Sequence, residues 1–163
     1  MVDLKCLEFD ELKELCKSIG EPEFRAKQIF SWLSKGVDSF DEMTDISKKT
    51  KEKLLEVSYI SRLRILEKYI SKLDGTVKYL LSLDDDNCIE TVVMRYHHGI
   101  TVCISSQVGC RMGCGFCAST IGGLYRNLTA GEILNQVIYA QKDTGERISN
   151  IVMMGIGEPL ANY

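Results

Sequence analysis

Three of the seven cysteines lie within eight residues, at Cys110, Cys114 and Cys117. This C-x3-C-x2-C spacing would let three thiolates on one short loop each bind one iron of a cubane [4Fe-4S] cluster, leaving the fourth iron without a cysteine. Gly113 and Gly115 would allow the backbone to wrap closely around the cluster. Because an open coordination position distinguishes a catalytic metal site from a closed structural one, the spacing favours a reactive iron–sulfur centre.

Zinc is the main alternative to iron in this loop. A structural zinc site needs four ligands, usually as two C-x2-C pairs, and the cysteines at 6, 16, 88 and 103 form no second pair. A ferredoxin that only carries electrons would normally supply a fourth cysteine ligand. A secreted disulfide framework would have an even number of cysteines and follow a signal peptide, so we expect a reducing, cytoplasmic setting.

The elements around the loop place it at the end of a strand. A strand is predicted over 100–105, and the carboxyl ends of strands are where open α/β sheets and barrels hold their active sites. After the loop, Thr129 and Glu132 form a capping box for a helix that continues to about residue 142. The apolar run 148–154 fits a buried parallel strand. Strand, loop, helix and strand together make one βαβ unit.

Residues 1–60 are predicted to form a small helical domain. Apolar spacing and terminating glycines predict three helices, at 8–19, 22–36 and 48–57. Ser47 can cap the third of these helices. The aromatic residues Phe24, Phe30 and Trp32 are expected in the core of this domain rather than on a stacking surface.

Residues 61–99 are predicted to form a β-meander. Their strand-like runs are separated by Asp74-Gly75, which is a strong hairpin signal, and by the acidic segment 84–87. The acidic segment lacks the glycine and glutamate that would complete a calcium loop, so we expect a solvated turn. The whole chain is therefore expected to have an α/β fold, with 100–163 as the start of a larger sheet.

The net charge of −3 conceals a segregation of charge along the chain. Residues 1–46 have a net charge of −5, whereas 47–73 contain 8 basic and 3 acidic side chains. A local basic segment inside an acidic protein can contact phosphates. A solvated helix face explains the same charges equally well.

The cysteine loop resembles the signature of the radical S-adenosylmethionine (SAM) superfamily, C-x3-C-x-aromatic-C, with Phe116 as the aromatic residue. Longer strings resemble one family within it, the RlmN-type RNA methyltransferases, which methylate C2 of an adenine. These strings lie at 24–29, 40–45, 89–94, 101–110, 117–120, 126–128 and 155–159. The resemblance covers essentially the whole chain and implies a radical SAM partial (β/α) barrel.

The resemblance also implies which residues hold the cofactors. Cys110, Cys114 and Cys117 would bind a [4Fe-4S] cluster, whose open iron would take the amine and carboxylate of SAM. Gly157 and Glu158 would contact SAM, with Glu158 as an acceptor for its ammonium group. The cofactor would supply the difficult chemistry, and the protein would position it.

Two further residues stand at catalytic positions of the family. Adenine C2 is not nucleophilic, so the family methylates it with a carbon radical formed on a methylated cysteine further along the chain. Glu90 would remove the C2 proton as a general base. Cys103 would release the product by displacing the tethered RNA with formation of a disulfide. Without the resemblance, the residues alone favour an exposed strand position for Glu90 and a small buried hydrophobic residue for Cys103.

The implied partners are 23S rRNA, tRNA and an electron donor such as flavodoxin, and the enzyme would be a monomer. No run approaches the 18 or more apolar residues of a membrane span. Only 63 residues follow from position 101, whereas a complete barrel needs about 250, so we expect the amino-terminal part of a longer enzyme, inactive alone. The alternatives are the related C8-adenine methyltransferases, or a non-catalytic RNA-binding module with a structural metal.

Overall fold

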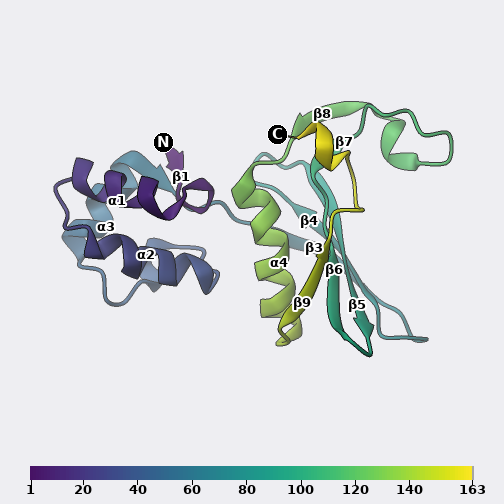
Figure 1. Cartoon of the computed structure of the whole chain (residues 1–163), viewed down its shortest axis with the longest axis horizontal. Helices are drawn as coiled ribbons and strands as arrows, with labels where there is room; N and C mark the ends of the chain where they lie inside the picture. Colours follow the sequence, from purple (N-terminus) through teal and green to yellow (C-terminus); the bar gives the residue numbers. More distant parts are fainter. Residues whose placement is uncertain (163) are drawn as a thin grey trace. The chain divides into compact units, whose positions relative to one another are not determined.

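A computed structural model describes residues 1–162, which form two compact units (Figure 1). One unit runs from Met1 to Arg62, and the other begins at Leu63. The predicted meander 61–99 and the segment from residue 100 share one sheet in the second unit, because β5 (Cys88–Tyr96) pairs with β6 (Gly99–Cys103). No helix in residues 1–162 is long and apolar enough to cross a membrane.

The first unit is helical, as the sequence predicts. Its helices are α1 (Phe9–Ser18), α2 (Phe24–Ser34) and α3 (Lys48–Val57), and two short parallel strands pair, β1 (Val2–Asp3) and β2 (Ser58–Tyr59). Ser47 caps α3 by accepting a hydrogen bond from the amide of Thr50. Leu12, Ile29 and Leu54 are fully buried, one from each helix, so the three helices share one core.

The prediction that Phe24 and Phe30 lie in the core is wrong. Their side chains are 59% and 45% exposed. The buried positions of α2 are Ala26, Ile29 and Leu33, whose helical spacing defines a face that leaves both phenylalanines outside. Trp32 lies at the boundary, where it is partly buried against the core.

The second unit is built on a mixed sheet. In the described residues the strand order is β3-β4-β5-β6-β9. The strands are β3 (Arg64–Ile70), β4 (Val77–Ser82), β5 (Cys88–Tyr96), β6 (Gly99–Cys103) and β9 (Ile148–Val152). The first four strands form the predicted antiparallel meander, and β9 joins β6 in parallel. The connection from β6 to β9 includes helix α4 (Ala130–Thr144), which lies against one face of the sheet (Figure 1).

Helix α4 has the ends that the sequence predicts. Thr129 and Glu132 form the capping box, and Gly145 ends the helix in the left-handed conformation. Strand β9 differs from its prediction, because it ends at Val152 and is largely exposed. It is an edge strand with β6 as its one neighbour in residues 1–162, and Ile151 is 54% exposed as a result.

Short elements make up the rest of the secondary structure in residues 1–162. Two of them are strands that form a separate hairpin, β7 (Gln107–Gly109) and β8 (Leu124–Asn127). Four are 3-10 turns, η1 (Leu4–Cys6), η2 (Phe40–Glu42), η3 (Ala118–Thr120) and η4 (Pro159–Ala161).

Candidate active site

The cysteine loop is held at its base by the β7–β8 hairpin. The amide of Cys110 donates to the carbonyl oxygen of Gly123 at 3.0 Å, which closes the loop immediately beyond the paired strands. Gly109 adopts φ +73°, and a Cβ atom at this position would collide with that same carbonyl. Sequence reasoning missed this hairpin because its strands are only three and four residues long.

The three predicted cluster ligands lie on this one loop in different surroundings. Cys110 is buried, Cys117 is partly buried and Cys114 is exposed, and none of the seven cysteines forms a disulfide. A hollow of about 420 Å³ is lined by residues 113–118 together with Thr120 and Ile121. Within residues 1–162 no three potential ligands are gathered as a metal site. The donor set therefore suits an iron–sulfur cluster chemically, although the side chains do not converge on one point.

The predicted SAM-binding stretch lies against the segment that leads into this loop. The amide of Ile104 donates to the carbonyl of Val152 at 2.9 Å, which continues the β6–β9 pairing beyond the strands. Further on, the amide of Ser106 donates to the carbonyl of Ile156 at 2.9 Å. Gly157 has φ +105°, and a Cβ there would lie 2.6 Å from the Cβ of Gln107. The 155–158 stretch thus needs glycine for this close approach.

Gln107 links the hairpin to the SAM-binding stretch. Its buried side chain accepts a hydrogen bond from the amide of Glu158 at 3.0 Å and donates to Asn127 Oδ1 at 2.8 Å. The carboxylate of Glu158 accepts from the amide of Leu160 and so caps η4. Beside Gly157, the hydroxyl oxygen of Ser106 is buried and has no hydrogen-bond partner in the described chain. Where the 155–158 stretch packs against residues 106 and 107, the Ser106 hydroxyl is therefore left to bind a polar ligand.

Glu90 and Cys103 lie on the face of the sheet opposite α4. Val92 pairs directly with Cys103 across β5 and β6, and alternation places Glu90 on the same face as Val92. The intervening Thr91 points to the other face, where its hydroxyl donates to Gln136 of α4. The two residues predicted to be catalytic are therefore neighbours on one surface.

The carboxylate of Glu90 forms an ion pair with Lys78 of β4. The Lys78 Nζ lies 2.6 Å from Glu90 Oε1, and the two side chains are 46% and 43% exposed. Solvent screens a pair at this exposure, so the lysine orients the carboxylate more than it stabilises the fold. The carboxylate remains accessible from the open face of the sheet.

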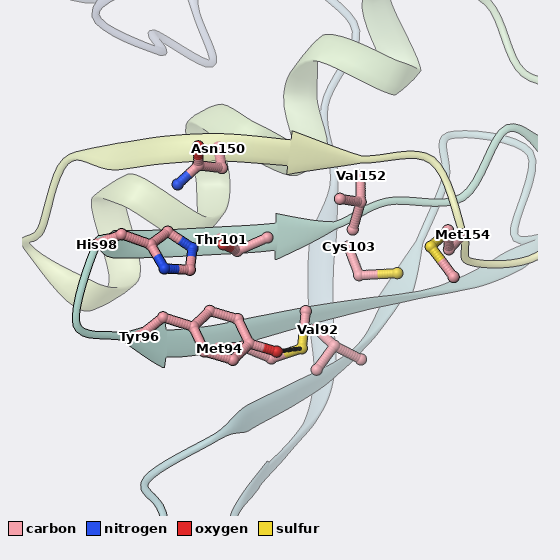
Figure 2. A pocket seen from close by; sticks show the side chains of 9 residues that line it. All are labelled: Val92, Met94, Tyr96, His98, Thr101, Cys103, Asn150, Val152 and Met154. Atoms are coloured by element: carbon pink, nitrogen blue, oxygen red, sulfur yellow. Dashed lines mark hydrogen bonds between the residues drawn. The ribbon is translucent and has the colours of Figure 1, made fainter.

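Cys103 opens onto a largely apolar cavity of about 650 Å³ on this face (Figure 2). Side chains of β5, β6 and β9 form its walls, and Figure 2 shows the thiol of Cys103 between Val92 and Met154. The lining residues are Val92, Met94, Tyr96, His98, Thr101, Cys103, Asn150, Val152 and Met154. A cavity of this size and polarity can accept an aromatic ring.

Strand β8, which follows the cysteine loop, is held in place by a cluster of ion pairs around Arg126. Arg126 of β8 donates to both carboxylate oxygens of Glu132, each at 2.8 Å, and to Asp85 at 2.7 Å. The guanidinium of Arg126 lowers the pKa of Asp85 to about 2 and is the largest influence on it. The 84–87 segment is a turn as predicted, but Asp85 is not simply solvated, because it ties the meander to β8 and α4.

The lysines of α3, at the start of the basic segment 47–73, are only partly available for a ligand. Lys48 and Lys49 are exposed. Lys51 donates to the carbonyl of Asp41 at 3.1 Å, and Lys53 pairs with Glu21 at 2.7 Å. Two of the four lysines of α3 thus make contacts within the helical unit itself.

Comparison with known proteins gives the class first. Over all of its length the chain superposes, with a TM-score of 0.90 and 40% identity, on 49% of the chain in the crystal structure of a radical SAM methyltransferase from Sphaerobacter thermophilus. The fold is therefore that of the amino-terminal part of a radical SAM methyltransferase, without a closed barrel in the described residues.

Comparison with sequence relatives indicates one family within this class. Residues 2–60 match the family described as ribosomal RNA large subunit methyltransferase N-terminal domain. The chain is 58% identical to a probable dual-specificity RNA methyltransferase RlmN of Alkaliphilus oremlandii, over 99% of this chain and 47% of the relative. It is also 58% identical to the protein of that name from Clostridioides difficile, over 98% of this chain and 47% of the relative. The chain thus matches RlmN proteins over nearly all of its own length and spans about half the length of these relatives.

Proposed function

We propose that this chain is the cluster- and SAM-binding part of an enzyme that methylates C2 of adenine in 23S rRNA and tRNA. The observation that carries this proposal is the meeting of two motif segments at the carboxyl ends of the parallel strands β6 and β9. One segment leads into the cysteine loop, and the other is the 155–158 stretch. A ligand at this edge could touch both, as is usual for active sites of α/β sheets.

In this proposal Cys110, Cys114 and Cys117 bind the [4Fe-4S] cluster, and Gly157 and Glu158 bind SAM. When bound, the cluster and SAM would supply a carbon radical, which can add to a ring carbon that ordinary methyl transfer does not methylate. The chain's own contribution is to hold SAM beside the cysteine loop. The hydrogen bond from the Glu158 amide to Gln107 supports this role, since it fixes the stretch to the base of the loop.

Glu90 and Cys103 complete the reaction on the open face of the sheet. The adenine ring lies against the apolar cavity, where the carboxylate of Glu90 accepts the C2 proton. The Cys103 thiolate then attacks the sulfur that tethers the RNA, so that the disulfide bond forms as the bond from this sulfur to the methylene carbon breaks. The methylene carbon keeps that electron pair and takes up a proton to become the methyl group. The one electron left over from the radical addition would return to the cluster. The common face of Glu90 and Cys103 supports this assignment, because both groups must reach one base.

The proposal extends to partners and setting. An electron donor such as flavodoxin reduces the cluster, the exposed lysines of α3 contact RNA phosphates, and the enzyme acts as a cytoplasmic monomer. The exposure of Lys48 and Lys49 supports the RNA contact.

Anaerobic reconstitution with iron and sulfide tests the cofactors. A four-iron absorbance spectrum that changes when SAM is added supports the proposal, whereas one tightly bound zinc and no response to SAM would identify a non-catalytic module.

For the reaction, RNA treated with a full-length enzyme containing this chain is digested and its nucleosides are analysed by mass spectrometry. We expect 2-methyladenosine, and 8-methyladenosine would establish the C8 alternative instead.

A further inference from the structure

Ser105 joins two functional segments with one hydroxyl group. It lies two residues beyond Cys103, the last residue of β6, and is fully buried. Its Oγ donates to the carbonyl oxygen of Glu90 at 2.7 Å and accepts from the amide of Ile156 at 3.0 Å. One side chain thus connects the strand that carries the predicted general base with the predicted SAM-binding stretch.

The main chain of Ser105 is itself fixed by Gln136 of α4. The buried Gln136 amide accepts from the Ser105 N–H at 2.8 Å and donates to the Ser105 carbonyl at 2.9 Å. It also accepts from the Thr91 hydroxyl at 2.8 Å. Because an amide side chain offers both donors and acceptors, Gln136 fixes Ser105 relative to α4 and β5 together.

The space around Ser105 favours a small side chain with a hydroxyl group. A Cβ placed on Gly155 would lie 2.8 Å from Ser105 Oγ, so the 155–158 stretch packs directly on this oxygen. Removing the hydroxyl would leave the Ile156 amide and the Glu90 carbonyl without these partners. A buried polar group that loses its partner is expensive, so the local structure must shift to satisfy both groups.

We propose that Ser105 is a positioning residue, which sets the SAM-binding stretch relative to Glu90 through the Ile156 amide and the Glu90 carbonyl. Its role in turnover rests on the proposed function. Gln136 supports it by restraining its backbone.

Ser105→Ala tests the role directly. Hydrogen exchange at the Ile156 amide is measured in the 163-residue chain, where we expect exchange roughly tenfold faster because the amide has lost its acceptor. In a full-length enzyme containing the chain, we expect the KM for SAM to rise severalfold, with a smaller change in kcat. The matched control is Ser58→Ala, since Ser58 is also fully buried and donates to a backbone carbonyl, that of Leu54, at 2.7 Å.

The control should leave Ile156 exchange and the KM for SAM unchanged. Ile156 exchange in Ser105→Ala that equals the wild-type rate would overturn the proposal, as would a KM shift no larger than that of Ser58→Ala. If Ser105→Ala does not fold, Gln136→Met is measured in the same way, and an unchanged Ile156 rate there overturns the proposal equally. The exchange experiment needs no cofactor, so failure of the wild-type enzyme to form 2-methyladenosine would refute the proposed function alone.

Discussion

Replacing Arg126 with glutamine should destabilise the second unit far more than the same replacement of Arg64, an arginine with a more exposed ion pair. Arg126 contacts Glu132 through two nitrogens, and the side chains of this pair are only 28% and 12% exposed. Arg64 of β3 pairs with Asp86, which lies in the same turn as Asp85, but the side chains of this pair are 64% and 85% exposed. The two arginines therefore form a matched test and control that differ in burial.

The expected loss of unfolding free energy depends on which charged groups each variant leaves without a partner. Removing one partner of a fully buried ion pair costs about 3–5 kcal/mol, since the other charge is left uncompensated. Glu132 keeps its hydrogen bond from the Thr129 amide, and solvent reaches part of Arg126, so we expect about 2 kcal/mol from this contact. The more exposed contact with Asp85 adds at most about 1 kcal/mol. Arg64→Gln should cost at most about 0.5 kcal/mol.

Urea unfolding followed by circular dichroism measures both losses. The single tryptophan, Trp32, lies in the helical unit, so its fluorescence reports separately on that unit. We expect the Arg126→Gln loss to appear in the circular dichroism transition, at about 2–3 kcal/mol. A loss for Arg126→Gln no greater than that for Arg64→Gln would refute the reasoning, because burial would then not decide the strength of these pairs.

Three further outcomes are expected. Charge reversal of Lys48 and Lys49 should weaken tRNA binding and reduce the slope of log affinity against log salt by about 1–2, whereas an unchanged slope in salt titrations removes them from the interface. Cys114→Ala should lose the four-iron cluster, whereas the control Cys88→Ala, which also changes an exposed cysteine, should retain it. Iron and sulfide analysis measures both variants, and equal iron contents would contradict the assignment of Cys114 as a ligand. The lowered pKa of Asp85, about 2, stabilises the fold above its ordinary value of 3.8, and this stabilisation is lost as the pH falls from about 4 towards 2. Asp85→Asn should therefore flatten the acid limb of stability measured by urea unfolding between pH 5 and 2.

The sequence predicts best where the determining contacts are local. The capping signals at Ser47 and Thr129 act over three residues, and both helices begin where these signals place them. The bounds of β5 also agree with the sequence, since a run of β-branched residues ends at turns on both sides. Nothing distant is needed to recognise such elements.

The helical domain shows where a local pattern is insufficient. Helical spacing in α2 is clear, but its apolar residues extend further around the helix than the core covers, and the sequence does not say which of them are buried. Phe24 and Phe30 suggest burial by their size, whereas the smaller Ala26 lies on the face that packs. Close packing against α1 and α3 decides this, and that information comes only from the assembled core.

The polar residues that hold the candidate site were missed for a related reason. Gln107 and Arg126 lie in the matching strings 101–110 and 126–128 without an assigned role, and Gln136 lies in none of these strings. Several of their partners lie far away in the sequence. Gln107 bonds to residue 158, and Gln136 bonds to residue 105. A glutamine in a sequence without known neighbours predicts only a solvated surface position. Its function as a buried link appears once the sheet brings distant segments together.

Strand register finally determines whether the predicted catalytic residues can act together. Alternation along β5 places Glu90 and Thr91 on opposite faces, but it does not say which face carries Cys103. The pairing of Val92 with Cys103 decides this, because a shift of one residue would turn Glu90 towards α4 and away from the cavity. Ser105, two residues beyond Cys103, donates to the Glu90 carbonyl and would lose this contact in any other register. The hydroxyl that positions the SAM-binding stretch therefore also stabilises the pairing that brings Glu90 and Cys103 to one face.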